Sequence, residues 1–153
     1  MQTRRLTAGP TSHYAVIFQT GDEPMAGLTA FAREAALDGA HFTAIGAFER
    51  VTLGWFDLAT REYRRIEVDE QVEVLSLVGD VTRAGPRGDE PKVHAHVVVG
   101  RADGAALGGH LLEARVRPTL EVVLTETPAV LRRRDDPATG LALIDLAADD
   151  GPG

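Results

Sequence analysis

Two kinds of spacing between apolar residues divide the chain into one helical stretch and a long β-rich remainder. Residues 24–37 carry Leu28, Phe31 and Ala35 three and four positions apart, which is the spacing of one face of an amphipathic helix. Pro24 suits the first turn of a helix, where its missing N–H is not needed. The pattern therefore predicts one main helix over about residues 24–37, covering one face of a sheet.

Apolar runs with alternating or continuous character fill most of the remaining chain and predict β-strands. The predicted strands cover residues 13–19, 40–48, 50–57, 62–68 and 72–78, three successive strands within 93–126, and a short edge strand at 141–146. A polar loop over 82–91 splits this β region, and Asp103-Gly104 predicts a hairpin turn. The chain is therefore expected to be mostly sheet.

Length and composition are those of one ordinary globular domain. The chain has 153 residues, of which 44% are hydrophobic and 25% charged, values typical of a globular fold. We expect an N-terminal arm over residues 1–12, a single domain over 13–146 and a frayed acidic tail over 147–153.

Charge and cysteine content exclude several classes of function. The net charge of −7 argues against non-specific nucleic-acid binding, which needs a surplus of Lys and Arg. The chain has no cysteine, so any metal must be held by His, Asp or Glu and there can be no disulfide. The sequence shows neither a signal-peptide pattern nor an apolar stretch long enough to span a membrane. A cytoplasmic protein without a membrane partner is expected.

Three of the five histidines fall within the predicted strands after residue 92. Side chains two apart in a strand point to the same face, so His94 and His96 are expected side by side. His110 on a neighbouring strand can bring a third imidazole over the same spot. Three neutral imidazoles on a sheet suit a divalent transition metal, zinc first, with one coordination position open. The alternative is polar packing of these histidines in a subunit interface.

Glu121 shares its strand face with Val123 and Thr125. One interpretation makes its carboxylate a general base, or a group that orients a ligand imidazole. The other interpretation is an ion pair with an arginine such as Arg50 or Arg117, and the sequence leaves both open.

Three aromatic residues on a predicted hairpin also allow two interpretations. Trp55, Phe56 and Tyr63 can line a ligand pocket or form part of a core or interface. Their role does not follow from the sequence.

Several linked segments of the chain resemble the plants-and-prokaryotes conserved (PPC) domain family, in its prokaryotic stand-alone form. The segments that carry this resemblance are residues 40–47, 72–79, 94–100, 108–113 and 118–126. They follow the order of the family and place the similarity over residues 13–146. The resemblance implies an α/β (α+β) fold in which one main helix packs against a largely antiparallel twisted sheet, assembled as a homotrimer.

The same resemblance leads to two classes of function. More distantly, the chain is similar in fold to acetolactate decarboxylase, which binds zinc through a His-x-His pair and a later His. Positions 94, 96 and 110 match that order, which implies a zinc site. If the protein is an enzyme, we expect the metal to act on a small carbonyl or carboxylate compound, with Glu121, from its strand position, as the acid/base candidate. The remainder of a decarboxylase site has no counterpart here, so that activity does not transfer.

The second class is a non-catalytic DNA-binding, regulatory or protein-interaction module. Plant members of the family accompany AT-hook segments that bind DNA. Here Arg87-Gly88 lacks the Arg-Gly-Arg-Pro core of an AT-hook, and the negative net charge also disfavours DNA.

Overall fold

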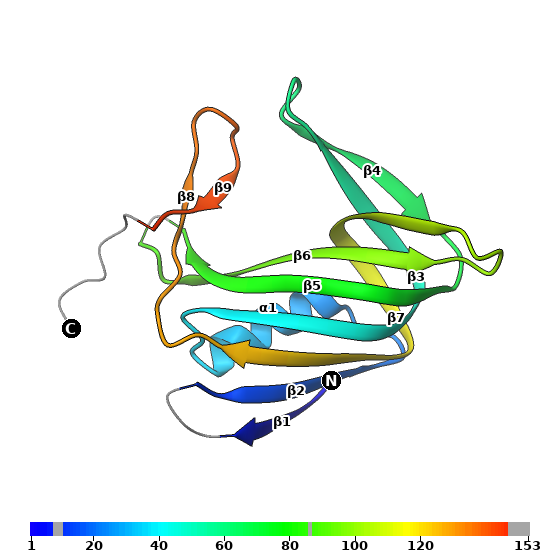
Figure 1. Cartoon of the computed structure of the whole chain (residues 1–153), viewed down its shortest axis with the longest axis horizontal. Coiled ribbons are helices and arrows are strands. Elements are labelled where there is room, and N and C mark those ends of the chain that lie inside the picture. Colours follow the sequence, from blue (N-terminus) through cyan, green and yellow to red (C-terminus); the bar gives the residue numbers. More distant parts are fainter. Residues whose placement is uncertain (8–10, 86, 147–153) are drawn as a thin grey trace.

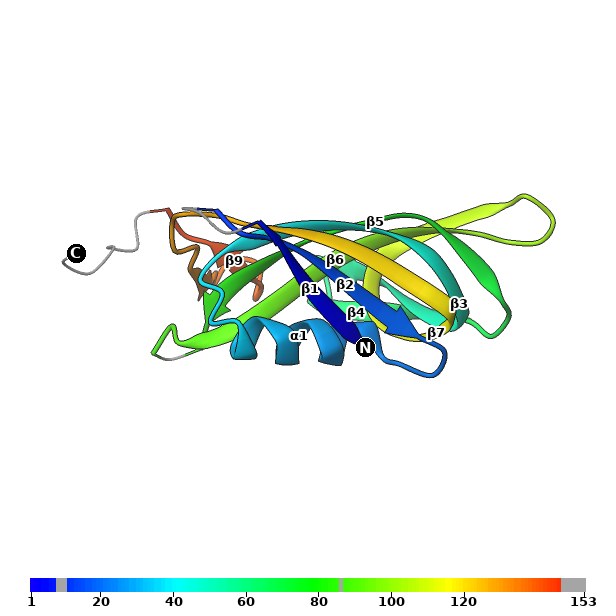
Figure 2. The same ribbon diagram turned by 90° about the horizontal axis from the view of Figure 1, so that it is seen from below.

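One helix packs against a curved antiparallel sheet in the computed structural model, which describes residues 1–7, 11–85 and 87–146 (Figures 1 and 2). The described elements are β1 (Gln2–Thr7), β2 (His13–Gln19), α1 (Pro24–Glu34), β3 (Ala40–Asp57), β4 (Glu62–Val68), β5 (Val72–Ala84), β6 (Glu90–Gly100), β7 (Ala106–Glu126), β8 (Arg133–Asp135) and β9 (Ala142–Ile144). Seven strands form the main sheet in the order β1-β2-β7-β6-β5-β3-β4, and β8 and β9 form a separate two-stranded sheet. The predicted fold class is confirmed. None of the described residues forms a helix with the length and apolar character needed to cross a bilayer.

The long strands β3 and β7 curve the sheet because each changes partners along its length. The C-terminal part of β7 pairs with β2 and with the start of β3, whereas its N-terminal part pairs with β6 and with the end of β3. The β3–β7 register shifts at several bulges, one of them beside Gly46. A side chain at Gly46, whose φ is +150°, would meet the backbone of Thr119, which is the close approach that a glycine bulge permits. As a result, the end of β7 that carries His110 lies against β6.

Helix α1 begins where the sequence predicts and ends three residues earlier. The Glu23 carboxylate accepts hydrogen bonds from the first N–H groups of the helix, and Pro24 is its first residue. Ala36 adopts a left-handed conformation with φ of +51°, which ends the helix before residue 37. Leu37 is nevertheless fully buried, which explains why the apolar pattern continues past the helical backbone.

Several predicted strand boundaries are wrong because strands that pair on both sides continue through local irregularities. Residues 40–48 and 50–57, predicted as a pair, form the single strand β3, and the three strands predicted within 93–126 are the two strands β6 and β7. The predicted loop 82–91 is shorter, since β5 runs to Ala84 and β6 starts at Glu90.

Both ends of the described chain carry β-structure outside the predicted strands. The predicted edge strand 141–146 contains β9, which pairs with β8 and not with the main sheet. Residues 1–12, predicted as an arm, contain β1, which pairs with β2. Residues 8–10 and the predicted tail 147–153 lie outside the described residues.

The two faces of the main sheet differ sharply in composition. The inner face, together with α1, encloses the core, whose largest fully buried side chains include Phe18, Phe42, Phe48, Leu53, Leu111 and Leu120. The opposite, outer face carries an exposed apolar patch, called here the outer-face patch, which consists of Ile45, Val78, Val98 and Val123. Strand pairing places Val78 opposite both Thr43 and His96, so this patch adjoins the histidines.

Candidate metal centre

The structure brings His94, His96 and His110 together on the outer face. His94 and His96 alternate with Val93, Ala95 and Val97, which are buried in the core on the other side of β6. Register pairs His96 with His110 across β6 and β7. Each of the three histidines offers a ring nitrogen, and the three nitrogens lie within 4.8 Å of one another. The predicted common face of these residues is confirmed.

The spacing of these nitrogens is compatible with a common metal ion. The Nε2 atoms of His94 and His96 are 3.2 Å apart, and two nitrogens bound tetrahedrally to one zinc ion are separated by about 3.3 Å. Nδ1 of His110 is buried and has no hydrogen-bond partner among the described residues. A buried polar atom without a partner is costly. The three residues therefore fit a metal ion with an open coordination position.

Burial keeps two of these imidazoles neutral. Burial, together with smaller effects of the neighbouring His94 and His96, lowers the pKa of His110 to about 4. The pKa of His96 is lowered by burial and then by His94, against a smaller opposing effect of Asp80. Metal binding requires unprotonated rings, so the lowered pKa values of His96 and His110 favour coordination by these two rings.

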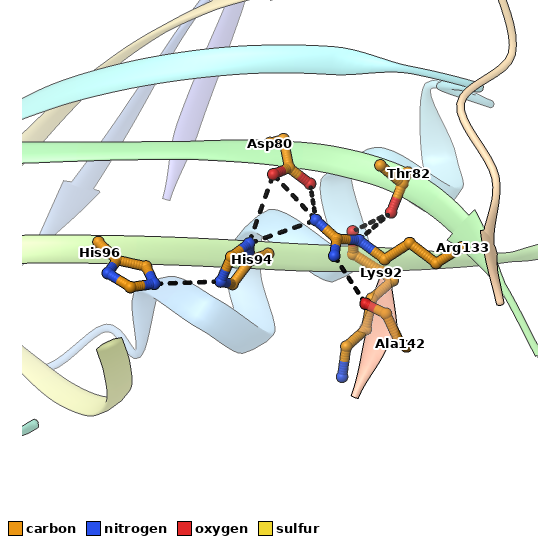
Figure 3. A network of polar contacts seen from close by, with 7 residues as sticks. All are labelled: Asp80, Thr82, Lys92, His94, His96, Arg133 and Ala142. Carbon is orange, nitrogen blue, oxygen red and sulfur yellow. Dashed lines mark hydrogen bonds and ion pairs between the residues drawn. The ribbon is translucent and has the colours of Figure 1, made fainter. Parts of the chain in front are cut away.

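An aspartate and an arginine lie behind His94, and the sequence analysis did not identify either (Figure 3). Asp80 Oδ2 lies 3.4 Å from His94 Nδ1, and Arg133 Nη2 donates to both Asp80 oxygens. Burial alone would raise the pKa of Asp80, but the hydrogen bonds from His94 and Arg133 outweigh it and the pKa is lowered. Asp80 lies two positions after Val78 and therefore points to the same outer face of β5. An acidic residue at such a position in an apolar strand could have indicated a role in the site, but the predicted strand ended at residue 78.

The three aromatic residues of the β3–β4 hairpin separate onto its two faces. The Tyr63 ring lies 4.9 Å from the His110 ring, and Phe56 packs edge-on against Tyr63. Trp55 is 55% exposed and lies under the guanidinium of Arg64. Tyr63 thus forms a wall of the histidine site, and burial raises the pKa of its phenol. Trp55 is directed to the opposite side of the hairpin.

Glu121 lies elsewhere on the outer face. It is exposed and pairs with Ile17 on β2 and Ile45 on β3, which puts it beside the outer-face patch. Arg50, one of its predicted partners, forms an ion pair with Glu49 at 3.3 Å. The cluster of potential ligands consists of the three histidines without Glu121, so its acid/base role stays a prediction.

Comparison with known proteins identifies one family and several structural relatives. The model of the Plants and Prokaryotes Conserved (PCC) domain, also abbreviated PPC, matches residues 5–128. A metal-containing protein from Archaeoglobus fulgidus is 32% identical with a TM-score of 0.78, and the match covers 86% of this chain and 91% of that one. A Bacteroides thetaiotaomicron protein with a provisional DNA-binding assignment is 27% identical with a TM-score of 0.81, covering 94% and 96%.

Two further likenesses are more limited. A Staphylococcus aureus protein similar to alpha-acetolactate decarboxylase has a TM-score of 0.52 at 14% identity, covering 74% of this chain and 51% of that one, which is a likeness of fold alone. The bifunctional protein GlmU of a Synechococcus strain is 31% identical over 138 residues, or 88% of this chain. The chain spans about a fifth of the length of that curated relative.

Proposed function

This chain belongs to the Plants and Prokaryotes Conserved (PCC) domain family, and from that premise we propose that it is a metal-binding member. In this proposal His94, His96 and His110 hold one divalent transition metal, with zinc the first choice. The absence of cysteine leaves nitrogen and oxygen ligands, and three imidazoles are a common protein set for zinc with an open position.

The observation that carries the proposal is the convergence of three ring nitrogens within 4.8 Å, one ring having a buried nitrogen without a partner. Such an arrangement costs free energy in a metal-free protein, because nearby imidazoles repel when protonated and the buried nitrogen is unsatisfied. A metal ion bound by the three rings keeps them unprotonated and removes the repulsion. The metal-containing relative from Archaeoglobus fulgidus adds support.

The chemistry of such a site would be acid catalysis by the cation. A bound metal supplies a Lewis acid for a carbonyl or carboxylate oxygen, or lowers the pKa of bound water. The chain's own contribution is to orient the three rings, to exclude water on the side covered by Tyr63, and to hold Asp80 behind His94. If the protein is an enzyme, we propose a small carbonyl or carboxylate compound as substrate and Glu121 as the acid/base candidate.

Metal analysis of protein purified without a histidine tag tests the site. We expect about one zinc ion per chain after zinc loading and removal of excess metal. His94→Ala should reduce the content to background, since two imidazoles without a third ligand bind zinc weakly. His41→Ala is the matched control, because His41 is also an exposed outer-face histidine but lies on β3 outside the cluster. Equal zinc content in wild type and His94→Ala would contradict the proposal.

We further propose that the protein assembles as a homotrimer through the outer face. The outer-face patch supports this, since four exposed aliphatic side chains on neighbouring strands favour burial against another protein surface. Light scattering during gel filtration should give three times the mass of the 16.4 kDa chain. Val123→Lys should shift the mass downwards. A monomeric wild type would end this part of the proposal.

The alternative function is DNA binding, favoured by the assignment of the Bacteroides relative. The net charge of −7 weighs against it. Phosphate contacts would give duplex affinity that falls steeply with salt concentration, so the absence of binding at low salt would exclude this function for the chain. Either function suits a cytoplasmic location, which we also propose and which cell fractionation would test.

A further inference from the structure

The C-terminal hairpin lies beyond the residues that match the family, yet it contacts the histidine site. The family match ends at residue 128, and β8 and β9 follow it. The hairpin is attached to the end of β5, where the Arg83 N–H donates to the Leu131 carbonyl at 2.7 Å. Figure 1 shows it as a separate projection next to the end of β5 and the start of β6. Its first residue in β8 is Arg133.

The side-chain nitrogens of Arg133 donate hydrogen bonds both to β5 and to β9 (Figure 3). Nη2 donates to Asp80 Oδ1 and Oδ2 at 2.8 and 3.0 Å, and Nε donates to Thr82 Oγ1 at 3.0 Å. Nη1 donates to the Ala142 carbonyl on β9 at 2.8 Å. The side chain is only 8% exposed. The guanidinium thus joins the hairpin to β5 of the main sheet.

Arg133 and Asp80 form a partly buried ion pair in which each charge stabilises the other. A charge removed from water is costly unless an opposite charge and hydrogen bonds replace the lost solvation. Here the carboxylate and the guanidinium provide this for each other, and the guanidinium fork fixes the carboxylate geometrically. The position of the Asp80 oxygens therefore depends on the hairpin.

Asp80 in turn faces the ring nitrogen of His94 that points away from the cluster. Nδ1 of His94 is 3.4 Å from Asp80 Oδ2 and 3.3 Å from Arg133 Nη2. Both hydrogens of Nη2 point to the Asp80 oxygens, which are closer than His94 Nδ1. The remaining partner of Nδ1 is therefore Asp80 Oδ2, which can only accept a hydrogen bond. A neutral imidazole with its proton on Nδ1 has a free lone pair on Nε2, the nitrogen that faces His96.

We propose that Arg133 is a positioning residue for His94: it holds Asp80 so that the carboxylate accepts the Nδ1 proton and Nε2 remains free to bind the metal. This inference rests on the metal site proposed for the three histidines. Groups that fix the tautomer of a ligand imidazole in this way typically change metal affinity 10- to 100-fold. Because coupling is reciprocal, metal binding should also strengthen the attachment of the hairpin to the main sheet.

Variants of the full chain test the positioning role with two readouts. Long-range ¹H–¹⁵N correlation of the imidazole rings reports which nitrogen of His94 carries the proton, and competition with a chromophoric chelator gives the zinc affinity. In the metal-free wild type we expect the proton on Nδ1. Arg133→Gln should populate the Nε2-protonated form and weaken zinc binding about 10- to 100-fold.

Arg134→Gln is the matched control. Arg134 neighbours Arg133 on β8, is 67% exposed and pairs with Asp145 at 3.1 Å, so its substitution removes a positive charge and a surface ion pair of the hairpin, which contributes little to stability, without touching Asp80. It should leave both readouts as in the wild type. An Arg133→Gln protein with unchanged tautomer and affinity would overturn the inference.

Asp80→Asn keeps the test decisive if Arg133→Gln does not fold. Its amide can present an N–H to Nδ1, which would move the His94 proton to Nε2, and an unchanged tautomer in this variant would equally overturn the inference. The spectra of the metal-free protein report the tautomer of His94, so they test the role of Arg133 even if the wild type binds no zinc. In that case the proposed metal site fails separately.

Discussion

The two faces of β6 illustrate two ways in which one strand serves the molecule. Inward, Val93, Ala95, Val97 and Val99 fill the core, and outward, His94 and His96 reach partners on other strands. Apolar packing on the inner face is non-directional and shared by many residues. On the outer face, the proposed metal site depends on the positions of individual ring nitrogens. Inner-face changes should therefore alter stability most, whereas outer-face changes should alter ligand binding most.

Truncating an inner-face aromatic residue is expected to have the largest effect on stability. Phe42 on β3 is almost fully buried and lies over Gly79 of β5. Phe42→Ala should lower the free energy of unfolding by about 3–5 kcal/mol, through lost burial and a residual cavity. Chemical denaturation of metal-free protein measures this. The outer-face variant His96→Ala should change the free energy of unfolding by less than about 1 kcal/mol, and equal losses in both variants would refute the contrast.

Acid should destabilise the metal-free protein through the histidines before it acts through the carboxylates. Well above pH 6.5, His110 is neutral in both the folded and unfolded chain. Between 6.5 and its folded pKa of about 4, the unfolded chain binds a proton that the folded chain does not. Stability therefore falls with falling pH in this window, by at most about 3 kcal/mol. The lowered pKa of His96 acts in the same direction.

Denaturant unfolding in the presence of a chelator at a series of pH values between 7.5 and 4 measures this slope. His110→Gln is the comparison, since it removes the titrating ring and should flatten the curve. The lowered pKa values of Asp22, Asp80 and Asp136 cost stability only as pH falls below the ordinary carboxyl range. An identical slope in His110→Gln would show that burial of this ring is not the cause.

The sequence was sufficient for the pattern of faces and insufficient for the register between strands. Alternation alone placed His94 and His96 on the face opposite Val97, and helical spacing alone located α1. Both are local properties of the chain. The boundary at residue 49 was wrong because β3 continues through bulges that its partner strands accommodate, and partner strands are not visible in a local window.

The same limit explains the missing part of the site. Asp80 faces His94 because β5 pairs with β6 at that register, and Arg133 arrives from a hairpin that does not pair with either strand as part of the main sheet. No spacing along the chain encodes these contacts, which lie 14 and 39 residues from His94. The proximity of His110 to His96 could be predicted, because β6 and β7 follow each other in the sequence and pair with each other.

Gly108 and Gly109, which precede His110 on β7, point to opposite faces of the sheet. Substituting each in turn therefore compares the two faces. A Cβ at Gly109 would lie 2.9 Å from the Gly54 carbonyl oxygen, whereas at Gly108 the nearest atoms are at 3.4 Å. Gly109→Ala should therefore cost about 1–3 kcal/mol by overpacking and, since β7 must shift, should weaken zinc binding. Gly108→Ala should lie within about 0.5 kcal/mol of wild type.

Parallel denaturation and zinc titration of the two glycine variants provide the measurement. Both substitutions add one methyl group to β7 close to His110. They differ in the face of the sheet on which the methyl group lies. If Gly108→Ala lowered stability more than Gly109→Ala, the close approach of the β3 and β7 backbones would not be the reason for a glycine at position 109.

The smallest effect is expected of Tyr63→Phe, which removes the hydroxyl group and keeps the ring. The Tyr63 ring packs against His110 at 4.9 Å, and the residue is 36% exposed. Tyr63→Phe keeps this packing, so stability should change by less than about 0.5 kcal/mol and zinc affinity should stay at the wild-type value. Tyr63→Ala removes the wall and should cost roughly 0.5–1.5 kcal/mol beyond lost burial, while His110 gains freedom and zinc binds less tightly. A Phe variant that binds zinc as poorly as the Ala variant would mean that the phenol oxygen, rather than the ring, acts on the site, and the outer face would then hold a fourth polar group beside the three imidazoles.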